Sequence, residues 1–331
     1  MKHFRSSIVI TIIGMLLALY MGGVEALYVV ALLAILEVSL SFDNAVVNAK
    51  VLETMEEKWQ KRFITFGIPI AVFGMRFLFP IVIVAIASGL GLWETFELAT
   101  HDPDTYKTTL MSVEKFIFAF GGSFLLMVFF HFIFDKDREE KWITIIEDSS
   151  VIDEMSKFSS IHMIIAIVVG LVLISMTQSY QIAIAYFMGV LLYSIIATLD
   201  DVLGVNGVRN GIMGFLYLEV LDASFSFDGV ISAFALSSDI FIIMIGLGIG
   251  AMFVRSLTLL MLQEKTLDEY RYLEHGAHYA IFALAVIMLA KIFIHVDELI
   301  VGTAGVAFIL VATYHSIQVN RANKKRVDNA V

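Results

Sequence analysis

Two acidic motifs of similar sequence lie within long apolar stretches of the chain. Residues 37–44 read Glu-Val-Ser-Leu-Ser-Phe-Asp-Asn, and residues 222–229 read Asp-Ala-Ser-Phe-Ser-Phe-Asp-Gly. Carboxylate, amide and hydroxyl oxygens favour hard divalent cations such as Mn²⁺, Mg²⁺ or Ca²⁺, and the chain has no cysteine thiolate for softer metals. The candidate metal-binding residues are Glu37, Asp43, Asn44, Asn48, Glu219, Asp222 and Asp228. We expect the cation to be a substrate and expect no tightly bound cofactor.

Charged side chains in apolar helices need compensation. An ionisable side chain at the centre of a membrane-spanning helix costs roughly 2.5 to 3.5 kcal/mol on insertion scales. The five candidate carboxylates outnumber the basic residues of the apolar stretches, Arg76, Arg255 and Lys291, by about two charges, which one divalent cation would balance. The alternative is that the carboxylates form buried salt bridges with the two arginines and only hold the helices together.

The spacing inside the first motif restricts how it can bind one ion. Six residues separate Glu37 from Asp43, which places them about 120° apart around an ideal helix and about 9 Å apart along it. Ser, Asn and Gly in both motifs are weak helix formers. We therefore expect both acidic helices to be interrupted near Ser-Phe-Asp, where freed carbonyl oxygens could join the carboxylates.

The composition is that of a polytopic membrane protein. Of 331 residues, 59% are hydrophobic and 16% are charged, and the mean hydropathy is +0.86. The net charge of −10 argues against a nucleic-acid partner. The chain lacks nucleotide-binding motifs, an HExxH motif and the aspartate of an intramembrane protease motif at 246–250, so we do not expect an enzyme.

Ten apolar runs predict an all-α protein with about ten membrane-spanning helices. The runs cover residues 7–23, 25–49, 64–91, 115–134, 160–177, 181–199, 211–236, 240–262, 277–295 and 298–318. The first run could instead be a cleaved signal peptide, but the topology needs it as a span. Lys and Arg concentrate in every second loop and in the tail, which predicts cytoplasmic termini in a bacterial inner membrane.

The second half of the chain repeats the order of features in the first half. Residues 67–76 (GIPIAVFGMR) match residues 246–255 (GLGIGAMFVR) in length and in their terminal Gly and Arg. Five helices in each half is an odd number, so the halves would have opposite orientations, as in many transporters. The expected units are 1–178, with a cytoplasmic loop at 135–159, then the inverted repeat 179–320, and a cytoplasmic tail at 321–331.

The two motifs resemble those of the TerC family of integral membrane proteins. The first family motif is matched by Glu37, Leu40, Ser41, Asp43 and Asn44, and the second by Asp222, Phe225, Ser226, Asp228 and Ala233. Gly229 replaces the serine usual in the family and removes one hydroxyl. The resemblance covers roughly residues 25–295 and implies an exporter of divalent metal ions, with Mn²⁺ as the main substrate.

From these features we expect a divalent metal transporter whose acidic ion site lies between two inverted repeats. Its partners would be the lipid bilayer and the cation, and a homo-oligomer is left open. The alternative function is a membrane scaffold in a metal or tellurite stress complex, which would carry ion-paired carboxylates and bind no metal. His131 and Lys291 either carry protons in an exchange cycle or occupy interfacial positions.

Overall fold

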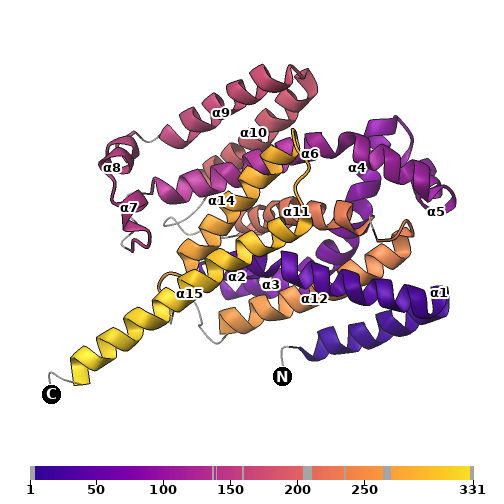
Figure 1. Ribbon diagram of the computed structural model, residues 1–331, viewed down its shortest axis with the longest axis horizontal. Helices are drawn as coiled ribbons and strands as arrows, with labels where there is room; N and C mark the ends of the chain where they lie inside the picture. Colours follow the sequence, from indigo (N-terminus) through magenta and orange to yellow (C-terminus); the bar gives the residue numbers. More distant parts are fainter. Residues whose placement is uncertain are drawn as a thin grey trace.

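The chain folds into helices throughout. The computed structural model describes residues 4–135, 138, 140–158, 160–203, 211–234, 236–263 and 270–328, without the side chains of a few of them, such as Phe227 and Asp228. It is 87% helical and has no strand in the described part, which confirms the all-α prediction. The helices (Figure 1) are α1 (Arg5–Leu40), α2 (Phe42–Glu53), α3 (Glu57–Pro69), η1 (Ile70–Leu78), α4 (Phe79–Ser88), α5 (Leu92–His101), α6 (Pro103–Ile133), α7 (Thr144–Glu147), α8 (Ser150–Ser156), α9 (Ile161–Thr177), α10 (Tyr180–Leu203), α11 (Ile212–Ala233), α12 (Ile240–Gln263), α14 (Leu273–Lys291) and α15 (Glu298–Asp328).

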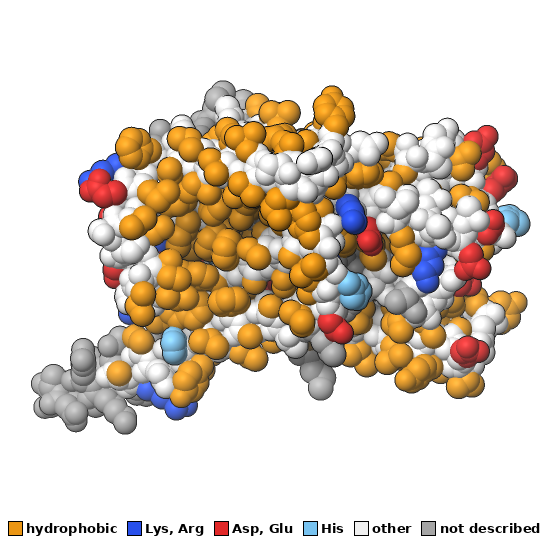
Figure 2. Space-filling view, turned by 45° about the horizontal axis from the view of Figure 1, so that its top comes forward, with side chains coloured by type: hydrophobic (Ala, Val, Ile, Leu, Met, Phe, Trp, Pro, Cys, Tyr) orange, Lys and Arg blue, Asp and Glu red, His pale blue; other side chains and the backbone are white. Residues whose placement is uncertain are grey.

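Several helices are long and apolar enough to cross a membrane. In the described residues there are six such helices, or up to eight if each of two bent pairs forms one span. The prediction of ten spans in two repeats is therefore not confirmed. One reason is that α11 carries three acidic residues in every stretch of 18 residues. Figure 2 shows a broad hydrophobic face with charged side chains mostly toward its left and right ends, as a membrane protein requires.

Helix α1 is folded back on itself at two glycines. Gly22 and Gly23 have non-helical backbone angles, and the φ of Gly23 is 65°, a value that favours glycine. Both arms pack on α12: Ser7 Oγ donates to the Met252 carbonyl at 2.8 Å, and Gly246 lies against Leu33. The kink therefore separates two apolar arms that the sequence predicts as two separate runs.

Helix α3 continues through a stretch of π-helix, η1, into α4. The Phe79 N–H donates to the Gly74 carbonyl five residues earlier, which is the π-helical pattern. Pro80 has no N–H to donate to the Arg76 carbonyl, so the α-helical pattern cannot continue there. The distortion places Arg76 in the helix core between α11 and α12, both of which pack against η1.

Polar contacts join distant segments at one end of the helix bundle. Lys50 pairs with Glu274 at 3.3 Å, and Arg271 pairs with Glu140. Glu147 of α7 is buried there and anchors the segment between α6 and α9 to α14. Its carboxylate forms an ion pair with Arg138 at 3.0 Å and accepts hydrogen bonds from Tyr279 Oη at 3.1 Å and from two backbone N–H groups of the preceding segment.

Lowering the pH is expected to remove the stabilisation that Glu147 provides. Burial alone would raise its pKa, but His275 and Arg138 outweigh burial and lower it from 4.5 to about 2. Because the folded pKa is depressed, the contribution is complete above pH 4.5 and is lost as the pH falls toward 2. Thermal unfolding in detergent should show a higher unfolding temperature for the wild type than for Glu147→Gln. This difference should become smaller below pH 4.5.

The control for this titration is Glu154→Gln, because Glu154 is exposed on α8 and, among the described residues, forms its ion pair with the neighbouring Lys157. Its unfolding temperature should stay close to that of the wild type at every pH. A gap for Glu147→Gln that keeps its size down to about pH 3 would contradict the assigned role.

Close packing of α1 on α12 is expected to depend on Gly250. A Cβ atom at this position would lie 2.4 Å from Glu37 Cβ and 2.9 Å from the Ala34 carbonyl oxygen. Gly250→Ala should therefore cost about 1 to 3 kcal/mol and lower the unfolding temperature. The comparison is Gly91→Ala, where the new Cβ would meet only ordinary contacts with Glu94. Equal unfolding temperatures for the two variants would refute the close contact.

Candidate functional site

The first acidic motif interrupts its helix at Ser41. Helix α1 ends at Leu40 and α2 begins at Phe42, while Ser41 has φ −109° and ψ 16°. The predicted break in the helix is found at Ser41, but the Ser41 N–H still donates to the Glu37 carbonyl and the Ala45 N–H to the Ser41 carbonyl, so these two carbonyl oxygens are not freed. For the second motif the predicted interruption is wrong, because α11 is continuous from Ile212 to Ala233. Ser224 Oγ donates back to the Val220 carbonyl, which is compatible with an intact helix.

The two motifs lie side by side and run in opposite directions. Asn44 Nδ2 donates to Asp222 Oδ1 at 2.6 Å. Glu37, seven residues before Asn44, lies against Gly229, seven residues after Asp222. A Cβ atom at Gly229 would be 3.0 Å from Glu37 Oε2. Helix α2 and the end of α1 therefore face α11 through their acidic residues.

Glu37 is fully compensated by its neighbours. Its side chain is 1% exposed and forms an ion pair with Arg76 of η1, which is 3% exposed. Ser41 Oγ donates to the same carboxylate at 2.9 Å. The buried-salt-bridge alternative therefore describes this residue correctly.

A small cavity of about 30 Å³ lies among α2, α3, η1, α11 and α12. This volume can hold one water-sized particle. Its polar lining comes from Asn48, Arg76, Glu219, Asp222, Arg255 and Thr258. Glu219 Oε1, Asn48 Oδ1 and the nearby Asn44 Oδ1 are buried acceptors that have no hydrogen-bond partner in the described structure. Such orphaned acceptors are unfavourable unless a cation or a donor reaches them.

Other predicted ligands lie outside this cavity. Asp43 is 5% exposed, accepts a hydrogen bond from the Asn44 N–H at 3.0 Å and lies against Gly305 of α15. The backbone of Asp228 belongs to α11, but its side chain is outside the described part. Within the described residues, no three His, Cys, Asp or Glu side chains converge closely enough to hold a metal ion. The structure thus brings together Asn44, Asn48, Glu219 and Asp222, and it separates Asp43 and Glu37 from them.

Three polar residues of the cavity, Arg76, Arg255 and Thr258, were not among the predicted ligands. Arg255 Nη2 donates to the Phe63 carbonyl at 3.0 Å, and its guanidinium is attracted by the charges of Asp222 and Glu219 in the same cavity. Thr258 lines the cavity one turn after Arg255. Arg255 and Thr258 are three residues apart and so share one helix face, and this spacing is the feature of the sequence that could have predicted that both line the cavity.

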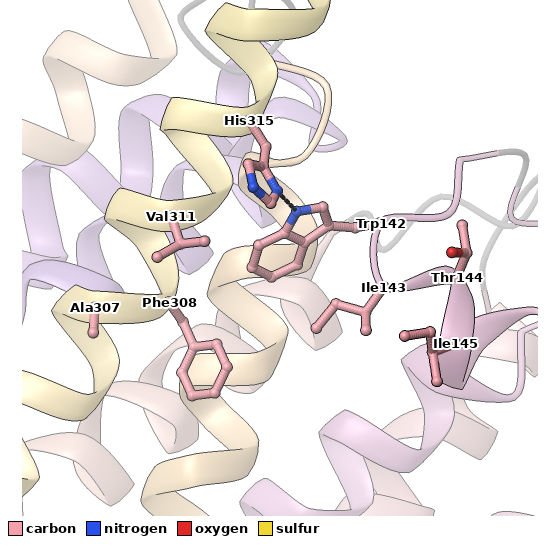
Figure 3. A pocket seen from close by; sticks show the side chains of 8 residues that line it. All are labelled: Trp142, Ile143, Thr144, Ile145, Ala307, Phe308, Val311 and His315. Atoms are coloured by element: carbon pink, nitrogen blue, oxygen red, sulfur yellow. Dashed lines mark hydrogen bonds between the residues drawn. The ribbon is translucent and has the colours of Figure 1, made fainter.

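Three further cavities lie near the ends of the bundle. One of about 430 Å³ is mostly apolar, lies between residues 142–145 and α15, and is bordered by a hydrogen bond from Trp142 Nε1 to His315 Nδ1 of 3.0 Å (Figure 3). His131 lines a second, of about 290 Å³, beside Lys50 and Glu274. Lys291 lines the third, of about 550 Å³, at the far end of α11.

Comparison with known proteins corrects the family expectation. No curated protein and no solved structure matches the chain. A family model described as "Protein of unknown function (DUF475)" matches residues 42–323, and the TerC family does not match. The predicted TerC membership is therefore wrong. The resemblance was carried by two short motifs, which are too short to assign a family. With the match spanning most of its length, the chain belongs to the DUF475 family.

Proposed function

We propose that the chain is a membrane transporter for a hard divalent cation, which binds in the small cavity between α2, α11 and α12. The observation that carries the proposal is the set of orphaned oxygens of Asn48 and Glu219, next to Asp222, in a buried cavity. Carboxylate and amide oxygens are the ligands that Mn²⁺, Mg²⁺ and Ca²⁺ accept. The preference for Mn²⁺ and for export came from the TerC resemblance, so neither is part of this proposal.

Charge balance supports the same substrate class. The described carboxylates of the core are Glu37, Asp43, Glu219 and Asp222, and the basic side chains beside them are Arg76 and Arg255. Together with Asp228 and Lys291, which the sequence adds, five carboxylates stand against three basic residues, an excess of two negative charges. One divalent cation would neutralise this excess, whereas a monovalent cation would leave half of it.

We also propose that the halves 1–178 and 179–320 act as inverted repeats. Reciprocal packing supports this: α2 of the first half packs against α12, and α11 of the second half packs against η1. Each arginine lies with the acidic residues of its own half, Arg76 at Glu37 and Arg255 beside Glu219. Relative movement of such halves would expose the cavity alternately to the two sides of the membrane.

A scaffold without transport is the second candidate, and one observation favours it. The Glu37–Arg76 ion pair and the Asn44–Asp222 hydrogen bond satisfy part of the acidic cluster inside the protein. If all of the cluster served this purpose, the protein would bind no divalent cation in micromolar solution.

The two candidates are separated by cation binding and flux in reconstituted vesicles. Glu219→Gln and Asp222→Asn keep the side-chain size but remove a charged ligand, so each should weaken binding and flux about 10- to 100-fold. Binding would be measured by titration calorimetry with Mn²⁺, Mg²⁺ and Ca²⁺, and flux with a metal-sensitive dye inside the vesicles.

The matched control is Glu97→Gln, because Glu97 lies on α5, where its only described side-chain hydrogen bond comes from the neighbouring Trp93. It should bind and transport like the wild type. Absence of binding in the wild type, or equal flux in all variants, would refute the proposed transport site and leave the scaffold.

A further inference from the structure

A larger cavity approaches the acidic motifs from one end of α11. This cavity of about 550 Å³, named here the α11 vestibule, is lined by Glu114, Phe118, Ile231, Ser232, Lys291 and His295 among others. Ser232 lies one helical turn after Gly229, the residue that faces Glu37. The vestibule therefore begins within one turn of the first acidic motif.

A row of small and polar residues connects the vestibule end of α11 with the small cavity. Asp222, Ser226 and Gly229 occupy positions i, i+4 and i+7 and so share one face of the helix. Ser226 is 3% exposed, and its Oγ has no hydrogen-bond partner in the described structure. A buried hydroxyl without a partner in the protein is available to a water molecule or an ion.

The Glu37–Arg76 ion pair lies between these two spaces. Arg76 is part of the wall of the small cavity, and Glu37 covers Gly229 at the level where the vestibule begins. An ion moving along the row of α11 must pass both side chains. In the pair's present arrangement it meets the positive charge of Arg76, while the carboxylate of Glu37 is already occupied.

The segment that carries Arg76 has an alternative conformation available. A π-helical stretch within a longer helix can return to α-helical hydrogen bonding wherever the N–H groups are present, which in η1 excludes only the bond from Pro80 to the Arg76 carbonyl. π-Helical turns are frequent at functional sites. Such a change in η1 alters the direction of the Arg76 side chain relative to α11. It would open the passage and release the Glu37 carboxylate in one step.

We propose that the Glu37–Arg76 ion pair is the gate between the small cavity and the α11 vestibule, and that η1 opens it by changing its helical hydrogen bonding. The proposal rests on the proposed transport function for the identity of the ion. The gate itself is a claim about access, which can be measured without any cation.

Access can be tested by cysteine labelling, because the natural chain contains no cysteine. Ser226→Cys places a thiol on the path, behind the gate. A membrane-impermeant thiol reagent applied from the vestibule side should label it slowly in an otherwise wild-type chain. Labelling should become about tenfold faster or more with Arg76→Gln or Glu37→Gln, because the open population rises.

Two further positions serve as controls. Ser224→Cys is on the same helix and equally buried but faces Gly121 of α6, so it should stay unreactive in every background. Phe293→Cys is at the exposed end of the vestibule and should react in every background. If a single charge removal prevents folding, the double variant Glu37→Gln with Arg76→Gln removes both charges of this pair together and should also accelerate labelling of Ser226→Cys.

Unchanged labelling of Ser226→Cys in all folded backgrounds would overturn the gate, even if Glu219→Gln abolishes transport. Accelerated labelling in a protein that binds no divalent cation would retain the gate and refute the proposed substrate. The failure of either proposal is thus distinguishable from the failure of the other.

Discussion

Placing carboxylates inside an apolar helix bundle is the constraint on which the rest of this structure depends. Glu37 shows most clearly what it requires. Arg76 and Ser41 compensate its charge, and glycines on both neighbouring helices make room for it, Gly229 on α11 and Gly250 on α12. The π-helical distortion of η1 and the interruption at Ser41 flank the same residue. Backbone irregularity in this core therefore concentrates where a charge must be accommodated.

Such an ion pair is costly to break, and this limits any mechanism that opens it. Removing one partner of a buried pair typically costs about 3 to 5 kcal/mol, because the other charge is left uncompensated. Opening therefore needs a substitute for the guanidinium. A cation that arrives at Glu37 as Arg76 leaves would supply this substitute. The Glu37 carboxylate, which holds Arg76 in the closed gate when no cation is present, would thus make opening of the gate dependent on the cation.

Helix content and the helix break at Ser41 could be predicted from sequence, because apolar runs and weak helix formers act locally. The continuous course of α11 could not, since Ser224 can bond to its own helix or disrupt it, and only the neighbouring helices decide. The separation of Glu37 from Asp43 followed from helix geometry, whereas the contact of Asp43 with Gly305 depends on tertiary packing. The family was predicted wrongly because the resemblance rested on two short motifs, whereas the family match spans residues 42–323.

Arg76 and Arg255 differ in their partners, and this difference is relevant to the choice between a transporter and a scaffold. Arg76 is paired with a carboxylate, while Arg255 donates to the Phe63 carbonyl, and Glu219 and Asn48 keep acceptor oxygens without donors in the described core. A purely structural lock would gain most by pairing both arginines with carboxylates, since unsatisfied buried acceptors reduce stability. Alternating access, by contrast, requires two related halves that are in different states at any one time. One half is then closed, and the oxygens of the other half are ready to bind an ion. Under the transport function proposed above, the unequal pairing of Arg76 and Arg255 would correspond to a closed side and an open side of the cavity.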